Sequence, residues 1–324
     1  MKKNIAIIMG GYSSEVAISI KSGNVVYKHL DAEKYNSYRI HIVKEGWFYI
    51  DSNEKKHAVN KDDFSIEIDG NKITFDCVFN AIHGAPGENG AILAYFDLLG
   101  IKHTSAPFYQ MALTFNKRDT LSVLQKYDIP TAKSVYLNKG NSVDPNEIVE
   151  KVGLPCFVKP NNAGSSFGIS KVYEAHKLYD AIDKAYQEDN EILIESFLEG
   201  TEVSVGVIEY KNEVLVLPMT EIVSENDFFD YEAKYEGKSQ EITPARISTE
   251  EENKVKTIAK KVYTVLNMSG FSRSEYILVN GEPHFLEMNT VPGLTEESIL
   301  PQQANEAGIS LAELFDNAIQ NQLN

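Results

Sequence analysis

The sequence predicts a mixed α/β protein of three domains, in which a parallel-sheet domain of βαβ units is followed by two smaller α+β domains. The chain has 324 residues, more than one hydrophobic core usually serves. Its first third alternates apolar, strand-like runs with helical patterns, as parallel sheets with right-handed crossovers do. The remainder mixes short strands with helices. We place the domains at residues 1–105, 106–190 and 191–324.

Apolar runs and turn residues locate the elements of the first domain. Strands are expected at residues 4–9, 38–43, 47–50 and 77–83, and helices at residues 15–30 and from about 90 to 99. Glycine-containing turns at residues 10–14 and 83–89 follow two of these strands. In parallel sheets, ligands bind beyond the carboxyl ends of the strands. These two turns are therefore candidate ligand-binding loops.

In the rest of the chain, the predicted strands and helices follow one another less regularly. A helix is expected at residues 107–127; the later strands are expected at residues 134–137, 156–159, 169–172, 191–196, 203–209, 214–220, 271–279 and 283–288, and the later helices at residues 144–152, 174–187, 249–266 and the carboxyl end. The segment 223–244 is too long and too aromatic for a plain connector. We interpret it as a lid that closes over a site.

Composition excludes several classes of protein. A net charge of −16 argues against a nucleic-acid partner, which usually requires a basic face. The longest apolar runs are strand-sized, so no membrane span is expected. The chain enters a strand at residue 5 without a signal-like segment, which favours the cytoplasm. Cys77 and Cys156 lie in apolar stretches and are expected to be reduced core residues.

The two carboxy-terminal strands carry a candidate metal site. Glu287 and Asn289 are two residues apart on one strand and so face the same side. With Glu275 they offer two carboxylates and an amide oxygen, which suit Mg²⁺ better than zinc. A two-residue turn at Asn280-Gly281 would pair Glu275 with Leu286 instead, so the site requires a three-residue loop or a β-bulge. The alternative is a pair of exposed acids on an edge hairpin.

Other segments are weaker signals taken singly. Lys159 ends a strand before a loop of small residues with Ser165 and Ser166, whose N–H groups suit phosphate oxygens; the alternative is a flexible hairpin. The apolar strand leading to Glu195 and Glu202 is suited to adenine and ribose. Local sequence explains two further residues without a function: Glu15 as a helix-start acid and His83 as a turn residue. Lys234 in the segment 223–244 could place a charge on phosphate when the lid closes.

In this order, these segments resemble the D-alanine–D-alanine ligase family of the ATP-grasp superfamily along the whole chain. The resemblance is carried by Gly10-Gly11-x-Ser13-x-Glu15, residues 78–84, Val158-Lys159-Pro160 with Gly164-Ser165-Ser166, residues 231–235, Arg273, residues 287–295 and Ser298. It implies an ATP-dependent acid–amino-acid ligase. ATP phosphorylates the first D-alanine, and the amine of the second attacks the acyl phosphate to form the dipeptide used in peptidoglycan precursors.

The resemblance also implies a role for each matching residue. The ATP phosphates would contact Lys117, Lys159, Lys234, Ser165 and Ser166, and the adenine and ribose would contact Glu195, Leu198 and Glu202. Two Mg²⁺ or Mn²⁺ ions would be bound by Glu275, Glu287 and Asn289. The substrates and the intermediate would contact Glu15, His83, Arg273, Gly293 and Ser298, with Tyr235 on the lid. A homodimer formed through the first domain is also implied.

Three positions depart from the family pattern, and other functions are considered. Glu275 stands where aspartate is common, Ser196 where some members have lysine, and Ala163 where some have an acid. Tyr235 favours D-alanine as the second substrate over D-lactate or D-serine. A glutathione-synthetase-like ligase would leave the lid motif unexplained, and a dinucleotide-dependent oxidoreductase would need a different first turn. A non-catalytic binding protein would not need the acidic residues.

Overall fold

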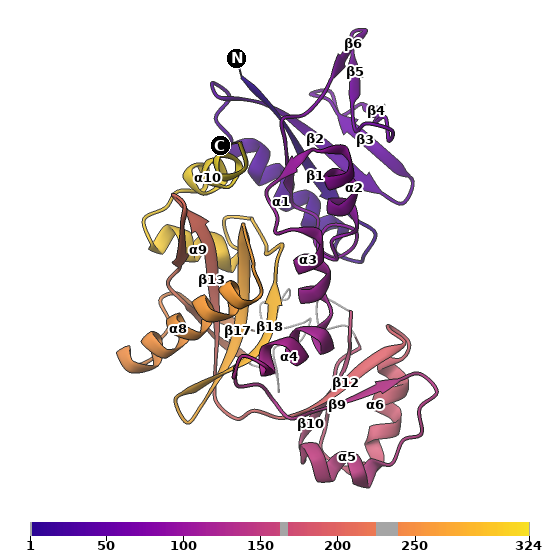
Figure 1. The fold of residues 1–324 in the computed structure, drawn as a ribbon, viewed down its shortest axis with the longest axis vertical. Helices are drawn as coiled ribbons and strands as arrows, with labels where there is room; N and C mark the ends of the chain where they lie inside the picture. The colour runs from indigo at the N-terminus through magenta and orange to yellow at the C-terminus, as the bar shows by residue number, and fades with distance from the viewer. Residues whose placement is uncertain (1, 163–167, 225–238, 324) are drawn as a thin grey trace.

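The computed structural model describes residues 2–162, 168–224 and 239–323. Three sheets organise this part of the chain, as the fold prediction expected. In Figure 1 the first sheet lies at the top with the amino terminus, the third lies in the middle, and the second lies at the bottom. Helices α3 and α4 run between the first sheet and the second. No helix in these residues is long and apolar enough to cross a bilayer.

The first sheet has six strands in the order β4-β3-β2-β1-β7-β8. Its parallel part consists of β1 (Lys3–Gly10), β2 (Tyr35–Val43), β7 (Cys77–Asn80) and β8 (Lys102–His103); β3 (Gly46–Ile50) and β4 (Lys56–Ala58) add an antiparallel edge. A separate ribbon pairs β5 (Ile66–Ile68) with β6 (Asn71–Ile73). The expected strand 77–83 ends at Asn80, and residues 81–83 lead from it without regular structure into the turn.

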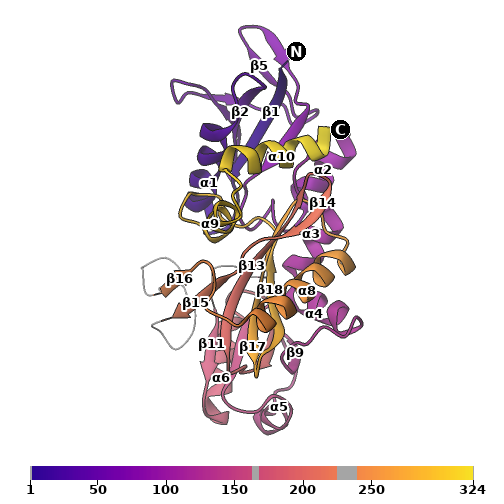
Figure 2. The ribbon, with the colours of Figure 1, turned by 90° about the vertical axis from the view of Figure 1, so that its left-hand side faces the viewer.

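Both faces of β1 are buried, because successive side chains point to opposite faces. Ile5, Ile7 and Met9 share a core with helix α1 (Val16–His29) and the last helix, α10 (Leu311–Leu323). Ala6 and Ile8 share another core with helix α2 (Ala91–Leu99). The carboxy-terminal helix thus covers the amino-terminal sheet, as Figure 2 shows.

The helix expected over residues 107–127 is two helices, α3 (Phe108–Phe115) and α4 (Lys117–Gln125). Asn116 between them has an extended conformation, and its side chain accepts a hydrogen bond of 3.0 Å from the N–H of Asp119. Asparagine favours this N-cap position over a helix interior because its side chain competes for backbone N–H groups. The break makes Lys117 the first residue of α4.

The second sheet is antiparallel, in the order β11-β10-β12-β9, with β9 (Ser134–Asn138), β10 (Cys156–Pro160), β11 (Ser170–Val172) and β12 (Glu191–Ser196). Helices α5 (Pro145–Val152) and α6 (Leu178–Ala185), with the 3₁₀ turn η1 (Ala175–Lys177), pack on one face. Strand β12 pairs within this sheet, although the expected domain boundary at residue 190 assigns it to the third domain. Phe157, Lys159 and Glu195 alternate onto the other face.

The third sheet has the order β16-β15-β13-β17-β18, and β14 pairs with β13. Its strands are β13 (Thr201–Tyr210), β14 (Glu213–Val216), β15 (Thr220–Ser224), β16 (Ser239–Ile242), β17 (Phe271–Val279) and β18 (Glu282–Asn289). The strand expected at residues 214–220 is therefore a hairpin partner, β14, followed by the start of β15. Helix α8 (Thr249–Val265) packs on the face with Val203, Val205 and Val207. Helix α9 (Ile299–Glu306) precedes α10.

Candidate active site

The predicted acidic cluster forms on the face of the third sheet that α8 leaves uncovered. Glu275 on β17 lies opposite Glu287 on β18, and Arg273 lies opposite Asn289. The turn at Asn280-Gly281 has two residues, but the register shifts between Glu275 and Tyr276. This bulge brings the two carboxylates to the same face, as the metal-site hypothesis required.

The residues around this cluster are enclosed and charged. Glu275 is 2% exposed, and its Oε1 lies 3.1 Å from the Arg273 guanidinium. Arg273 also donates a hydrogen bond of 3.3 Å to the Ser204 hydroxyl on β13. The Asn289 amide nitrogen is buried and has no hydrogen-bond partner among the residues that the structure describes. Apposed carboxylates beside an amide fit a hard cation such as Mg²⁺.

The acidic cluster contains only two carboxylates. Within residues 2–162, 168–224 and 239–323, no three His, Cys, Asp or Glu side chains group closely enough to hold a metal ion. A cation at Glu275 and Glu287 would therefore complete its shell with the Asn289 amide oxygen, water or phosphate oxygens, as Mg²⁺ commonly does.

Two predicted lysines approach the acidic cluster from different elements. The Lys117 ammonium, at the start of α4, lies 3.9 Å from a Glu287 carboxylate oxygen. Lys159, near the end of β10, lies 2.7 Å from the Glu195 carboxylate. Burial opposes charge on Lys159, but the carboxylates of Glu195, Glu287 and Glu202 outweigh it and raise the pKa of this ammonium. Lys159 is thus held as a cation next to the acids.

The residues predicted to hold adenine and ribose lie along the connection from the second sheet to the third. Glu195 is 3% exposed near the end of β12, Leu198 follows in the connector, and Glu202 is the second residue of β13. Beside them, the Lys171 ammonium on β11 lies 4.1 Å from the centre of the Phe197 ring. Sequence analysis missed Lys171, because its neighbours come from two other segments.

The two glycine-containing turns of the first sheet meet, as their positions after β1 and β7 predicted. The N–H of Tyr12 donates to the carbonyl of Ala85 at 2.7 Å, and the Ser13 hydroxyl donates to the carbonyl of His83 at 3.2 Å. Glu15 lies beside Gly84: a Cβ on that glycine would come within 3.2 Å of a Glu15 carboxylate oxygen. Glycine, with φ of 68°, therefore suits this close approach.

His83 connects the first sheet to the segment after β18. Its Nδ1 lies 2.7 Å from the carbonyl of Val291, and its Nε2 lies 2.9 Å from the Ser22 hydroxyl. Since a carbonyl only accepts, Nδ1 carries the proton and Nε2 accepts from Ser22. Burial lowers the pKa of His83, which favours this neutral form. Both ring nitrogens are therefore already used in buried hydrogen bonds.

Glu88 also connects the first sheet to the segment after β18, and the sequence did not predict this contact. One of its carboxylate oxygens accepts from the N–H of Gly84 at 3.1 Å, and the other accepts from Thr290 at 3.1 Å and Val291 at 3.4 Å. Burial raises the pKa of Glu88 to about 7, with a further contribution from Glu15, although the three N–H groups oppose the shift. In the sequence, nothing beyond an acid in a glycine-containing turn marks this residue.

Gly293 and Ser298 also come together, as expected. A Cβ on Gly293 would lie 2.6 Å from the Ser298 hydroxyl oxygen, so the glycine leaves room for that side chain. The hydroxyl groups of Thr295 and Ser298 are 2.8 Å apart. Ser298 precedes α9 as its N-cap. Four other predicted site residues, Ser165, Ser166, Lys234 and Tyr235, lie outside the described residues.

Two family models match this chain. A family model described as the D-ala D-ala ligase N-terminus matches residues 4–106, and one described as the D-ala D-ala ligase C-terminus matches residues 123–320. The chain belongs to the D-alanine–D-alanine ligase family. A relative from Flavobacterium johnsoniae named D-alanine–D-alanine ligase is 67% identical over 98% of both chains. One of the same name from Christiangramia forsetii is 58% identical over 100% of this chain and 99% of its own.

Solved structures of the family confirm the ATP-grasp fold. The VanG D-Ala:D-Ser ligase from Enterococcus faecalis has a TM-score of 0.87 at 31% identity, covering 99% of both chains. A D-alanine–D-alanine ligase from Bacillus anthracis complexed with ATP has a TM-score of 0.80 at 26% identity, covering 99% of this chain and 97% of its own. The predicted fold class and family are therefore correct.

Proposed function

We propose that the chain is an ATP-dependent ligase that joins two D-alanine molecules through a D-alanyl phosphate. One observation carries the proposal: Lys117 lies against the Glu275–Glu287 pair, with Arg273 beside Glu275, and the charges of Glu15 and Arg273 both act on His83. We expect such a grouping of charges to hold an amino acid, a triphosphate and a divalent cation side by side. The family relationship supplies the substrates that this grouping is expected to hold.

The nucleotide end is built from the second and third sheets. Lys117 and Lys159 neutralise the ATP phosphates, together with backbone N–H groups of Ser165 and Ser166. Glu195, Leu198 and Glu202 receive adenine and ribose. Glu275, Glu287 and Asn289 hold two Mg²⁺ or Mn²⁺ ions, which when bound neutralise charge on the phosphates. When ATP binds, its phosphates take the place of Glu195 and Glu287 as partners of the lysines.

The substrate end is built from the first sheet and the segment after β18. Glu15 binds the ammonium of the first D-alanine, beside Gly84. The amine of the second D-alanine attacks the carbonyl carbon of the acyl phosphate, and Arg273 stabilises the charge that develops on the tetrahedral oxygen. The bond from that carbon to the phosphate oxygen then breaks, inorganic phosphate leaves, and the amine loses its proton as the peptide bond forms. Gly293 and Ser298 bind the carboxylate of the second substrate. His83 acts here by fixing the Val291 carbonyl, since both its ring nitrogens are occupied.

The chemistry then requires positioning and exclusion of water more than a covalent nucleophile. An acyl phosphate hydrolyses if water reaches it, so a lid is needed while the amine attacks. We assign this role to residues 223–244, with Lys234 on phosphate and Tyr235 near Ser165 and Glu15. This segment includes the end of β15 and all of β16, and these two strands pair with each other.

D-serine is the second candidate for the acceptor amino acid. One observation favours it: the VanG structure, named as a D-Ala:D-Ser ligase, matches this chain along almost its whole length. The relatives that are 67% and 58% identical are named for D-alanine alone. We therefore place D-alanine first and D-serine or D-lactate second.

The deciding experiment is ADP release from Mg²⁺–ATP with D-alanine alone, with L-alanine, and with D-alanine plus D-serine or D-lactate. We expect turnover and D-alanyl-D-alanine with D-alanine alone, and none with L-alanine. Turnover that requires D-serine or D-lactate would change the acceptor. A folded protein that binds ATP but releases no ADP with any D-amino acid would overturn the proposal.

The same proposal includes the cellular setting and the assembly. The dipeptide would serve peptidoglycan precursor synthesis in the cytoplasm, without a nucleic-acid or membrane partner. A homodimer through the first domain is supported by Leu98 of α2, whose side chain is 88% exposed there. We retain the three-domain division, with β12 moved into the central domain because it pairs with β9 and β10. Light scattering of the wild type and Leu98→Asp tests the dimer.

A further inference from the structure

Asn161 lies next to the two elements that carry Lys117 and Lys159, the lysines proposed above to bind the ATP phosphates. It follows Lys159 by two residues and comes directly after β10, which ends at Pro160. Its side chain is fully buried. A buried asparagine must satisfy its amide groups within the protein, so its hydrogen bonds show which elements it ties together.

The carbonyl groups of Asn161 receive the first N–H groups of α4. Its side-chain Oδ1 accepts from Arg118 at 2.9 Å, and its backbone oxygen accepts from Lys117 at 3.4 Å. The first N–H groups of a helix have no partner within the helix. Asn161 supplies those partners, and so joins the amino end of α4 to the end of β10.

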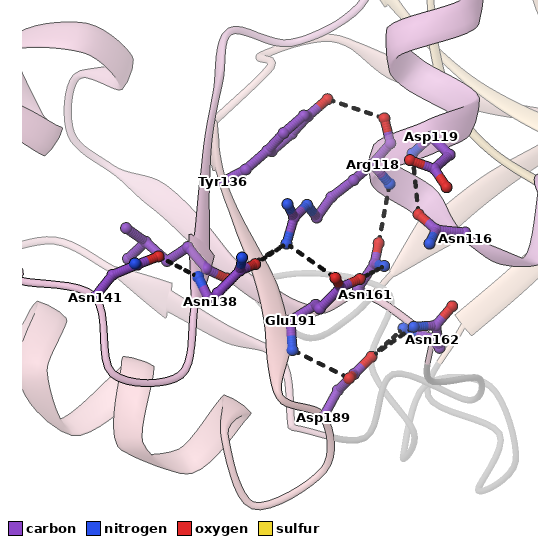
Figure 3. Close-up of polar contacts among 11 residues, drawn as sticks. Asn116, Arg118, Asp119, Tyr136, Asn138, Asn141, Asn161, Asn162, Asp189 and Glu191 are labelled. Atoms are coloured by element: carbon purple, nitrogen blue, oxygen red, sulfur yellow. Dashed lines mark hydrogen bonds and ion pairs between the residues drawn. The ribbon is translucent and has the colours of Figure 1, made fainter.

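The other half of the amide is tied to β12. Asn161 Nδ2 donates to the Glu191 carboxylate at 3.0 Å, and the N–H of Asn161 donates to the carbonyl of Glu191 at 2.9 Å. Asn162 adds two hydrogen bonds of 2.8 Å to Asp189. Figure 3 shows these contacts converging on the strand end, with Arg118 close to Asn138 and Tyr136.

We propose that Asn161 is a positioning residue that sets Lys117 and Lys159 at a fixed separation around the nucleotide phosphates. The inference rests on the phosphate-binding role proposed above for both lysines. Their two elements, α4 and β10, are distant in the sequence, and both lysines interact with Glu287. A tie between the elements keeps the two charges aimed at one place without contributing a ligand itself.

The donor and acceptor pattern at Glu191 allows a test that preserves shape. Asn161→Asp sets a carboxylate against Glu191, so the bond to β12 becomes a repulsion that displaces the side-chain oxygen on which the N–H of Arg118 depends. Glu191→Gln alone keeps that bond, because its amide oxygen still accepts from Asn161. In the double variant the new glutamine amide donates to the new aspartate carboxylate, which restores the bond with its direction reversed. Recovery in the double variant identifies the contact, since a general loss of stability would not recover.

Binding of ADP and of adenosine to each full-length variant, with Mg²⁺ present, separates phosphate binding from base binding. We expect Asn161→Asp to weaken ADP binding about tenfold or more, a loss typical of one hydrogen bond to a charged group, and to leave adenosine binding within about twofold. Glu191→Gln and the double variant should bind ADP within about threefold of wild type. Asn138→Ala is the matched control: it removes the 2.7 Å bond from the Arg118 side chain but leaves α4 tied to β10.

The outcomes distinguish this inference from the proposed function. Lys117→Met and Lys159→Met should each weaken ADP binding and spare adenosine binding; if neither does, the phosphate role of the lysines is wrong. If they do, but Asn161→Asp binds ADP as tightly as wild type, the positioning role of Asn161 is wrong. Equal losses of ADP and adenosine binding in Asn161→Asp, or no recovery in the double variant, would also overturn it.

Discussion

Glu275 lies opposite Glu287 because Leu286 is an extra residue in β18. Tyr276 pairs with Phe285 and Glu275 with Glu287, so Leu286 has no partner of its own in the ladder. Tyr276 and Phe285 are almost fully buried, with ring centres 5.8 Å apart. Without the bulge, β18 beyond Phe285 would present Glu287 on the α8 side of the sheet. The bulge thus keeps the aromatic pair in the core and both acids on the opposite face.

Glu287→Gln is expected to lower kcat for ADP release at least about 100-fold, because the change removes a charge that balances the phosphates and their cation. The fold should persist, since Glu287 is partly exposed and an amide has nearly the same shape. Thermal unfolding with and without Mg²⁺–ADP checks both points: the variant should melt near the wild type alone and gain less from the ligand. An equal gain from Mg²⁺–ADP would mean that Glu287 does not hold the cation.

Ser22 is predicted to support the segment after β18. It is fully buried, donates to His83 and accepts from the N–H of Leu294 at 3.2 Å. Ser22→Ala leaves both partners unsatisfied, so we expect a loss of about 1–3 kcal/mol in the free energy of unfolding, measured by urea denaturation. Ser122→Ala, which removes a hydroxyl from an exposed helix position, should change it by less than about 0.5 kcal/mol.

Ser22→Ala should also affect the binding of the second D-alanine and the binding of ATP differently. Because Leu294 adjoins Gly293, Ser22→Ala should raise the KM of the second D-alanine more than the KM of ATP. Equal changes in both KM values would mean that Ser22 contributes to general stability alone.

Much of the architecture was predictable because its signals are local. The apolar strand 191–196 and the strand 271–279 agree with β12 and β17 at both ends. The glycines at the end of β1 also located a turn: Gly10 and Gly11 have φ of 107° and 103°, which other residues rarely adopt. The sequence predicted that Glu275 and Glu287 would lie opposite each other only if the hairpin had a three-residue loop or a β-bulge. It could not decide between these cases, because turn residues identify the hairpin type but do not locate a bulge.

Features that depend on contacts between distant segments were not predictable. Glu88 receives N–H groups from residues 290–291, and Asn161 receives them from α4. Nothing in the neighbouring sequence of either residue indicates such partners. The break at Asn116 was missed for another reason: residues on both sides suit a helix, and a single N-cap residue interrupts them. His83 was found, but its sequence did not show that both ring nitrogens are occupied.

The raised pKa of Glu88 predicts a specific pH dependence of stability. A carboxyl whose pKa is about 7 in the folded chain and 4.5 in the unfolded chain binds more protons when folded. Its contribution to stability is complete below pH 4.5 and is lost as the pH rises through about 7. Glu88→Gln removes the titration, so wild type should lose roughly 1–3 kcal/mol relative to this variant between about pH 5 and pH 8.5.

Urea unfolding of the two proteins across that range, without ligands, measures the difference directly. Comparing the variant with wild type cancels the other titrating groups. A stability difference that stays constant with pH would show that Glu88 remains ionised throughout, with its three N–H donors outweighing burial. His83→Gln is a second variant for comparison, because His83 contacts the carbonyl of Val291 and the N–H of Val291 donates to Glu88.

Gln303 on α9 is predicted to hold the strand behind Arg273. It is fully buried, accepts from the N–H of Gly206 at 2.9 Å and donates to the carbonyl of Ser204 at 2.8 Å. Gln303→Leu leaves both backbone groups unsatisfied, which should cost about 2–4 kcal/mol. Because Arg273 donates to the Ser204 hydroxyl, kcat should also fall, while the KM of ATP changes less. Gln302→Leu, one residue away, is the control, because the described side-chain hydrogen bond of Gln302 goes to the carbonyl of Glu297 and not to β13. If both leucine variants lose the same stability and keep full kcat, Gln303 has no part in positioning Arg273.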